Sequence, residues 1–107
     1  MPLIRLEWDD IKVSEKDIEK LSLAVRDIVS EVTDIADVFV YANTAKIKVQ
    51  VAPIEIFVEM SYHKIKDETV LVNDIKEKLS EWKKTSEFKL PINLTLIPMH
   101  WKVEVGI

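Results

Sequence analysis

The sequence predicts a mixed α/β (α+β) domain made of two similar β-α-β halves. A strand-like segment begins at Pro2, and a second one of the same length and phase begins 51 residues later at Pro53. Each is followed by an amphipathic helical segment and then by another strand, and a crossover helix of this kind makes the strands it joins parallel. We therefore expect a four-stranded mixed sheet with two helices on one face and short arm strands. The domain spans residues 1–107, with pseudo-repeats at 2–51 and 53–105.

The first half of the chain alternates clearly between strand and helix patterns. Residues 2–8 alternate apolar and polar side chains, which predicts the first strand. Ser14 is placed to cap a helix that runs to Val32, with apolar residues at helical spacing. The β-branched and aromatic residues 38–41 favour a second strand. Residues 47–51 alternate again and predict an extended arm at a sheet edge.

The second half repeats this order. A strand over residues 53–60 precedes a helix that Asp67 caps and that ends near Lys84. The last strand covers residues 90–97, and Pro98 interrupts it before an extended tail. One side of the helix carries its apolar residues: Val70 or Leu71, Ile75, Leu79 and Trp82.

One face of the predicted sheet is left without a cover. Four strand residues point away from the face that the helices protect: Leu3, Phe39, Phe57 and Ile97. A face this apolar is unfavourable in water, and one layer of two helices cannot cover both sides of a sheet. We therefore predict that the protein self-associates through this face.

Composition excludes several classes of function. The apolar stretches are far shorter than the roughly 20 residues that cross a bilayer, so we expect no membrane span and no export leader. The chain has no cysteine, which excludes disulfides, thiolate catalysis and cysteine-ligated zinc and favours the cytoplasm. A net charge of -4 with interleaved lysines and glutamates argues against binding to nucleic acid. The composition is thermophile-like, because lysine is abundant and there is only one glycine.

The order of elements, the restart at Pro53 and the total length together resemble the tautomerase superfamily. That superfamily includes macrophage migration inhibitory factor, and its subunits start with Met-Pro and contain two β-α-β units. Within it, the chain most resembles a group of uncharacterised prokaryotic tautomerase-like proteins. These share a Met-Pro-x-x-Arg start, here with Pro2 and Arg5, and an Ile-Pro pair in the last strand, here Ile97 and Pro98.

The resemblance implies a homotrimer and a catalytic residue. In such a trimer, three sheets pack face to face inside a ring of helices, and the arms pair across subunits. The resemblance also implies that Pro2, freed by removal of the initiator methionine, acts as a general base in keto-enol isomerisation of a small carboxylic acid, without a cofactor. The chemistry is sound because an amine in an apolar pocket near cations loses its proton more readily.

The resemblance also suggests cations that could hold an anionic substrate. Many active members carry an arginine early on the second strand, where this chain has Phe39. A cation shortly after the first strand is also common, and Lys12 occupies a comparable position, with Lys64 as its counterpart in the second half. Lysines in loops are more often solvated than bound to an anion, so Lys12 and Lys64 are candidates only.

Arg5 is the third candidate for substrate binding. It is one of only two arginines in the chain, and arginine suits a fixed multidentate partner. The alternative is that Arg5 forms a structural ion pair with Glu55 or Glu59 across the sheet, and we favour this interpretation over ligand binding.

No metal site is expected. His63 and His100 are 37 residues apart with no metal-like spacing between them, and the single glycine rules out a glycine-rich phosphate loop. Two other hypotheses stay open beside the enzyme. One is a non-catalytic trimeric scaffold or binding protein of the same fold, and the other is a ferredoxin-like domain with a similar order of elements.

Overall fold

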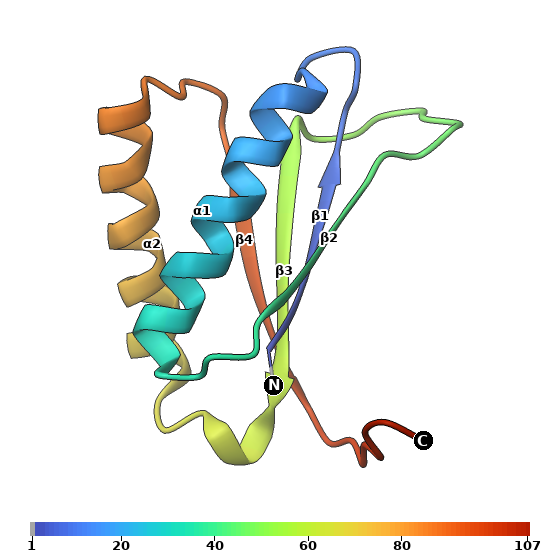
Figure 1. Cartoon of the computed structure of the whole chain (residues 1–107). Coiled ribbons are helices and arrows are strands. Elements are labelled where there is room, and N and C mark those ends of the chain that lie inside the picture. Colours follow the sequence, from blue (N-terminus) through green and yellow to red (C-terminus); the bar gives the residue numbers. More distant parts are fainter. Residues whose placement is uncertain (1) are drawn as a thin grey trace.

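The computed structural model describes residues 2–107 as a four-stranded sheet with two helices on one of its faces (Figure 1). The order of elements confirms the predicted double β-α-β pattern. Along the chain these elements are β1 (Leu3–Trp8), α1 (Glu15–Thr33), β2 (Phe39–Asn43), β3 (Ile54–Ser61), the short 3₁₀ helix η1 (Tyr62–Lys64), α2 (Glu68–Ser86) and β4 (Asn93–Met99).

The two halves of the chain meet in one sheet through their first strands, β1 and β3. Its strand order is β2-β1-β3-β4, with β1 parallel to β2, β3 parallel to β4, and the two central strands antiparallel. The direct pairing of β1 with β2 removes the ferredoxin-like hypothesis, because a split β-α-β unit places another strand between them. The mixed sheet is the one that the sequence predicts.

Both helices begin at capped ends. The Ser14 side chain accepts a hydrogen bond from the Asp17 amide at 3.1 Å, and Asp67 accepts one from the Val70 amide at the same distance. These caps satisfy amides that the helix itself leaves without a partner. On α2, the inner row uses Leu71 and not Val70, whose side chain is exposed. In the described part of the chain, neither helix is long and apolar enough to cross a membrane.

The core lies between the helices and one face of the sheet. Period-2 alternation aims every second residue of β1 and β3 at the helices, whose apolar stripes close the layer. The buried side chains are Ile4, Leu6, Val13, Ile18, Leu21, Val25, Val29, Val38, Ile54, Ile56, Val58, Ile75 and Leu79.

The opposite face of the sheet is open, as the sequence predicts. The strand register forms one row across this face from Phe39, Leu3, Glu59 and Ile97, and a second row from Tyr41, Arg5, Phe57 and Thr95. Phe39 and Tyr41 are 44% and 54% exposed. The two helices cannot reach these side chains because both lie on the other side of the sheet (Figure 1).

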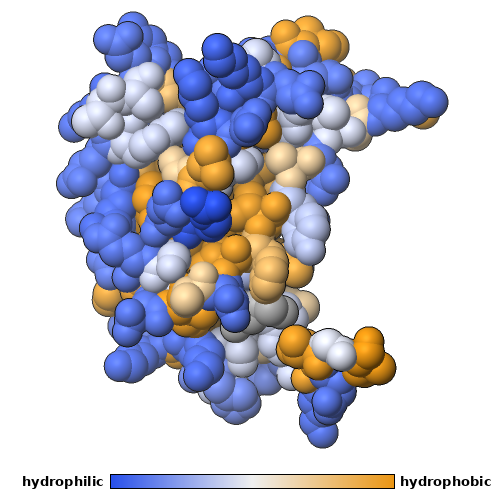
Figure 2. Space-filling model, in the orientation of Figure 1, coloured by the Kyte–Doolittle hydropathy of each residue, from blue (hydrophilic) through white to orange (hydrophobic). Residues whose placement is uncertain are grey.

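Two segments predicted as extended arms are not strands in the single chain. Residues 44–53, which we call the arm, and residues 100–107, which we call the tail, lie outside the sheet. Both project to the same side, away from the helices, and Figure 2 shows a hollow between them. Exposed apolar side chains occur on both: Ile47, Val49, Val103, Val105 and Ile107. An arm strand needs a partner edge, and one chain offers none here.

The last strand also differs from the prediction. β4 runs from Asn93 to Met99 and includes Pro98, which pairs with Met60, so this proline does not interrupt the strand. The reason is that β4 is an edge strand that pairs only with β3. A proline on an edge strand loses no hydrogen bond if the missing N–H would face outward.

Ile56 tests the position of the core. Its side chain is fully buried in the central strand β3, so Ile56→Ala should lower the free energy of unfolding by about 2–5 kcal/mol through lost contacts and a cavity. Ile11→Ala is the matched control, because Ile11 is 87% exposed and should leave the unfolding free energy within about 0.5 kcal/mol. Urea titration followed by circular dichroism measures both. Equal losses would contradict the assigned core.

Candidate functional site

Pro2 lies at the end of the sheet where β1 and β2 begin and β3 and β4 end. Its side chain is fully buried. Its carbonyl accepts a hydrogen bond from the Phe39 amide at 3.1 Å, which fixes it to the start of β2. The antiparallel register sets Leu3 opposite Glu59, so Pro2 continues the ladder beside Met60. Every residue that follows β3 or β4 is therefore close to this end.

Three rings gather where β3 and β4 leave the sheet. The ring centroids of Tyr62 and His100 are 4.7 Å apart, those of Tyr62 and His63 are 5.4 Å apart, and those of the two imidazoles are 6.5 Å apart. The parallel register that pairs Ser61 with Met99 brings them together. We call Tyr62, His63 and His100 the ring cluster. All three side chains are exposed.

Lys64 faces a different surface of the same turn. It lines a hollow of about 320 Å³ between the end of α1, the end of β3 and the start of α2. Met60, the neighbour of Pro2, lines the same hollow. The charges around it are Lys64 and Lys66 against Asp34, Asp67 and Asp74. The acidic groups outnumber the lysines, so this hollow attracts an anion weakly.

Arg5 is held on the open face of the sheet. Its guanidinium lies 3.6 Å from the Glu59 carboxylate and 3.8 Å from that of Glu7, and its central carbon is 5.1 Å from the centre of the Phe57 ring. Glu59 is one of the two partners that the sequence offers. These contacts already occupy the guanidinium, and a substrate-binding role for Arg5 stays a prediction.

Lys12 lies at the far end of β1 from Pro2, in the turn that leads to α1. Its amide donates to the Asp9 carbonyl at 3.1 Å, while its side chain is exposed. Since β1 is six residues long, about 20 Å of strand separates this turn from Pro2 in one chain. The structure thus places Pro2 and Lys64 at one end of the sheet and Lys12 at the other.

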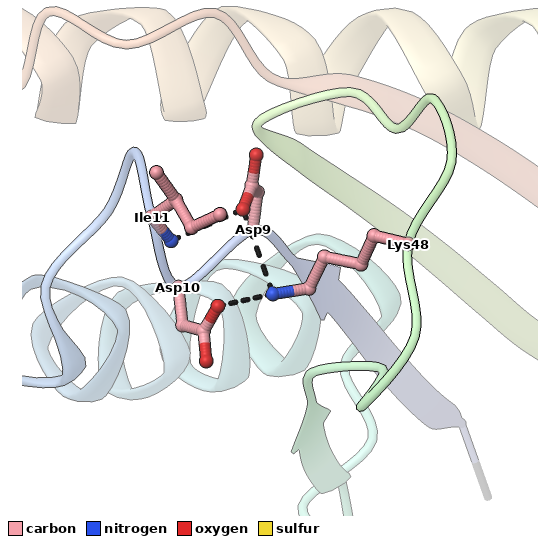
Figure 3. Close-up of polar contacts among 4 residues, drawn as sticks. All are labelled: Asp9, Asp10, Ile11 and Lys48. Carbon is pink, nitrogen blue, oxygen red and sulfur yellow. Dashed lines mark hydrogen bonds and ion pairs between the residues drawn. The ribbon is translucent and has the colours of Figure 1, made fainter.

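The far end is organised around Asp9, a carboxylate that is only 5% exposed (Figure 3). One of its oxygens accepts from the Ile11 amide at 3.0 Å, and the Lys48 amine lies 3.6 Å away and also pairs with Asp10. The Asp9 amide donates to the Pro53 carbonyl at 3.0 Å. Lys48 belongs to the arm, so these contacts tie the arm to the end of β1.

This ion pair changes the acidity of the lysine. The hydrogen bond to Asp10, together with the charges of Asp10 and Asp9, raises the pKa of Lys48 against an opposing effect of desolvation. A raised pKa means that the folded state favours the charged amine. The resulting stabilisation is present at neutral pH, below the unfolded lysine's pKa, and disappears only as the pH rises through the folded value.

Sequence reasoning missed two features of the site. His63 and His100 were assessed as a metal pair by spacing alone, whereas their shared position follows from the register of β3 and β4. A signal was available, because each histidine lies within two residues of the end of a strand of the second half. Within residues 2–107, no group of three or more metal-ligating side chains occurs. The burial of Asp9 was not predicted either, because an aspartate directly after a strand is typical of an exposed turn.

Sequence comparison places the chain in no group. No protein-family model matches it, and no curated protein matches it. Solved structures do match. A 5-carboxymethyl-2-hydroxymuconate delta-isomerase superposes with a TM-score of 0.66 at 12% identity, covering 99% of this chain and 89% of that one.

Two further structures have the same arrangement. A macrophage migration inhibitory factor-like protein from Entamoeba histolytica gives a TM-score of 0.59 at 17% identity, with 96% of this chain and 93% of that one covered. A fused 4-OT asymmetric trimer gives 0.57 at 8% identity, with 91% and 85% covered. All three belong to the tautomerase superfamily. The chain has the tautomerase fold. The resemblance inferred from the sequence is therefore confirmed at the level of the fold.

Asp9 in this tautomerase fold gives a test of the far end. Asp9→Ala should lower the free energy of unfolding by about 1–3 kcal/mol, because it leaves the Ile11 amide without its acceptor and removes a partner of Lys48. Asp10→Ala is the control: Asp10 is half exposed, and its loss should cost about 0.5 kcal/mol or less. Chemical denaturation at pH 7 measures both. An equal cost for the two variants would contradict the structural role of Asp9.

Proposed function

We propose that the protein is a cofactor-free tautomerase that isomerises the keto and enol forms of a small carboxylic acid, with Pro2 as general base. The observation that carries this proposal is the placement of Pro2, which directly precedes β1 at the sheet end that also carries the Lys64 hollow and the ring cluster. The tautomerase fold supports it, since an isomerase is among the structures that share that fold. Loss of Met1 makes Pro2 a secondary amine, and only that form is basic.

The general base acts through its nitrogen lone pair. The Pro2 amine takes a proton from the carbon next to the substrate carbonyl, and the electrons of that C–H bond move to the carbonyl oxygen as an enolate. Return of the proton to a different position completes the isomerisation. The buried position of Pro2 favours the neutral amine, because burial disfavours the charged form. Lys64, Arg5 and Lys12 are the cations that we propose for anion binding, and within one chain Lys12 lies farthest from Pro2 along the sheet.

We also propose that the active assembly is a homotrimer in the cytoplasm. The open apolar face, the projecting arm and the projecting tail are all on the side away from the helices. A trimer that packs the three open faces together would bury these surfaces and give the arms partner edges. A 4-OT trimer among the structures with this fold supports the proposal. In such an assembly, Lys12 of one copy could approach Pro2 of another.

A non-catalytic trimeric scaffold is the second candidate. It is favoured by the fact that Arg5 is engaged by two glutamates and that Phe39, not an arginine, occupies the start of β2. The same assembly would then serve for binding alone. Turnover by the purified protein separates the two functions.

Pro2→Ala tests the proposed chemistry. It should lower kcat/KM for an enol acid such as phenylenolpyruvate by at least about a hundredfold, the usual contribution of a general base. Pro53→Ala is the matched control, because Pro53 also directly precedes a strand and its carbonyl also accepts a backbone hydrogen bond, here from the Asp9 amide. It should keep full turnover. Equal turnover in Pro2→Ala and the unaltered protein would leave the scaffold as the better function.

Covalent labelling checks the free amine directly. One structure with this fold was inactivated by 2-oxo-3-pentynoate. The Pro2 lone pair would attack the alkyne carbon remote from the carbonyl, and the displaced π electrons would take up a proton, so the whole reagent mass is added and nothing leaves. Mass spectrometry of the intact protein and of its N-terminal peptide measures the adduct. A protein that retains Met1 in bulk would end the proline-base proposal.

Phe57→Glu tests the trimer. A charge placed in a dry interface costs several kcal/mol, so this variant should dissociate or unfold. Leu23→Glu is the control, because Leu23 is half exposed on α1, on the helical side. It should stay trimeric. Size-exclusion chromatography with light scattering measures both. A trimeric Phe57→Glu with an unchanged melting temperature would show that the open face is not the interface.

A further inference from the structure

The proposed function does not yet identify the group that binds the substrate carboxylate beside Pro2. Arg5 is engaged by carboxylates, Lys12 is at the far end of the sheet, and the hollow that holds Lys64 contains three aspartates. A substrate carboxylate at Pro2 therefore needs other donors from this end of the described chain. The ring cluster defined above is the nearest group of such donors on the open side of the turn.

The backbone of the 3₁₀ helix η1 explains why the ring cluster and Lys64 lie on different surfaces. In a 3₁₀ helix successive side chains turn by about 120°, so Tyr62, His63 and Lys64 point in three directions. Lys64 lines the hollow under α1 and α2, whereas the two preceding rings contact His100 at the end of β4. The imidazoles are therefore outside the acidic hollow.

We propose that His63 and His100, positioned by Tyr62, bind the carboxylate of a small 2-oxo acid beside Pro2. Their ring centroids are 6.5 Å apart at an interplanar angle of 89°. In the proposed complex, one carboxylate accepts an N–H from each ring at about 2.7–2.9 Å, the usual length of a charge-assisted hydrogen bond. Tyr62 contacts both imidazoles and so sets their spacing.

The cluster also has a suitable distance from the proposed base. Pro2 continues the ladder opposite Met60, and Tyr62 lies two residues further along β3's direction, which is about 7 Å of extended chain. A small 2-oxo acid held by its carboxylate at the imidazoles would extend toward Pro2 with its carbonyl carbon and the adjacent acidic carbon. This inference rests on the proposed function of Pro2 and adds the group that selects the substrate.

The test uses the rate of Pro2 labelling by 2-oxo-3-pentynoate at several reagent concentrations. His63→Leu and His100→Leu, which remove the N–H donors, should each raise the reagent concentration for the half-maximal labelling rate by roughly tenfold or more, as expected for a lost hydrogen bond to a charged group, with a similar limiting rate. Lys66→Gln, a change of an exposed lysine just after the same turn, is the control and should have a much smaller effect. The methyl ester of the reagent, which lacks the carboxylate, should label all of these proteins with the same concentration dependence.

Several outcomes would overturn the inference. Unchanged half-maximal concentrations in both histidine variants, a larger effect from Lys66→Gln, or an equal effect on acid and ester would each do so. Absence of any Pro2 adduct in the unaltered protein would instead overturn the proposed function, so the two failures are distinguishable. If a Leu variant unfolds, His100→Phe and His63→Phe keep a ring for packing against Tyr62 but also lack the N–H donors, and they must show the same tenfold effect.

Discussion

The antiparallel pairing of β1 with β3 decides where every candidate residue lies. Each half of the chain is a parallel β-α-β unit, so its own strands start at the same end. Joining the halves through antiparallel central strands puts the start of one half beside the finish of the other. Pro2 thus lies next to the turn after β3, and Pro53 lies next to Asp9 after β1. A parallel joint would have separated Pro2 from the ring cluster.

Because of the same pairing, each end of the sheet carries a proline whose carbonyl accepts a backbone hydrogen bond, but the side chains at the two ends differ. The Pro2 carbonyl accepts from Phe39, and the Pro53 carbonyl accepts from Asp9, at nearly equal distances. The Pro53 end is closed by a buried carboxylate and a lysine of the arm. The Pro2 end carries exposed imidazoles and a phenol instead. The repeat also explains why Lys12 and Lys64, which are counterparts in sequence, lie at opposite ends of one chain.

Local patterns predicted most of the fold. The helices, their Ser14 and Asp67 caps and the phase of each strand follow from spacings within a few residues, and all are present. The arm, residues 44–53, forms no strand within one chain, because its alternating pattern needs a partner edge that one chain does not supply. Pro98 was misjudged because its tolerance depends on β4 being an edge, which is a property of the whole sheet.

The site was harder to predict than the fold because its members come from distant segments. Pro2 was found through a resemblance, and Arg5 was correctly offered Glu59 as a partner because neighbouring strands share a face. The pairing of His63 with His100 depends on the register that sets Ser61 opposite Met99. A shift of one residue in that register would move the side chains of β4 to the other face. Spacing in sequence carries no information on this register.

The open face carries a charged pair within an apolar surface, which has consequences for assembly. Arg5 and Glu59 lie among Leu3, Phe39 and Phe57 in the two rows of this face. If copies of the chain cover the face, the pair loses water, and desolvation offsets much of its attraction. Hydrophobic residues would bind more tightly there. A buried ion pair penalises any packing that separates or misaligns the two charges, so Arg5 and Glu59 would define the relative position of the sheets more than the strength of their association. In the proposed trimer, that position would decide which residues of a neighbouring copy reach the Pro2 end.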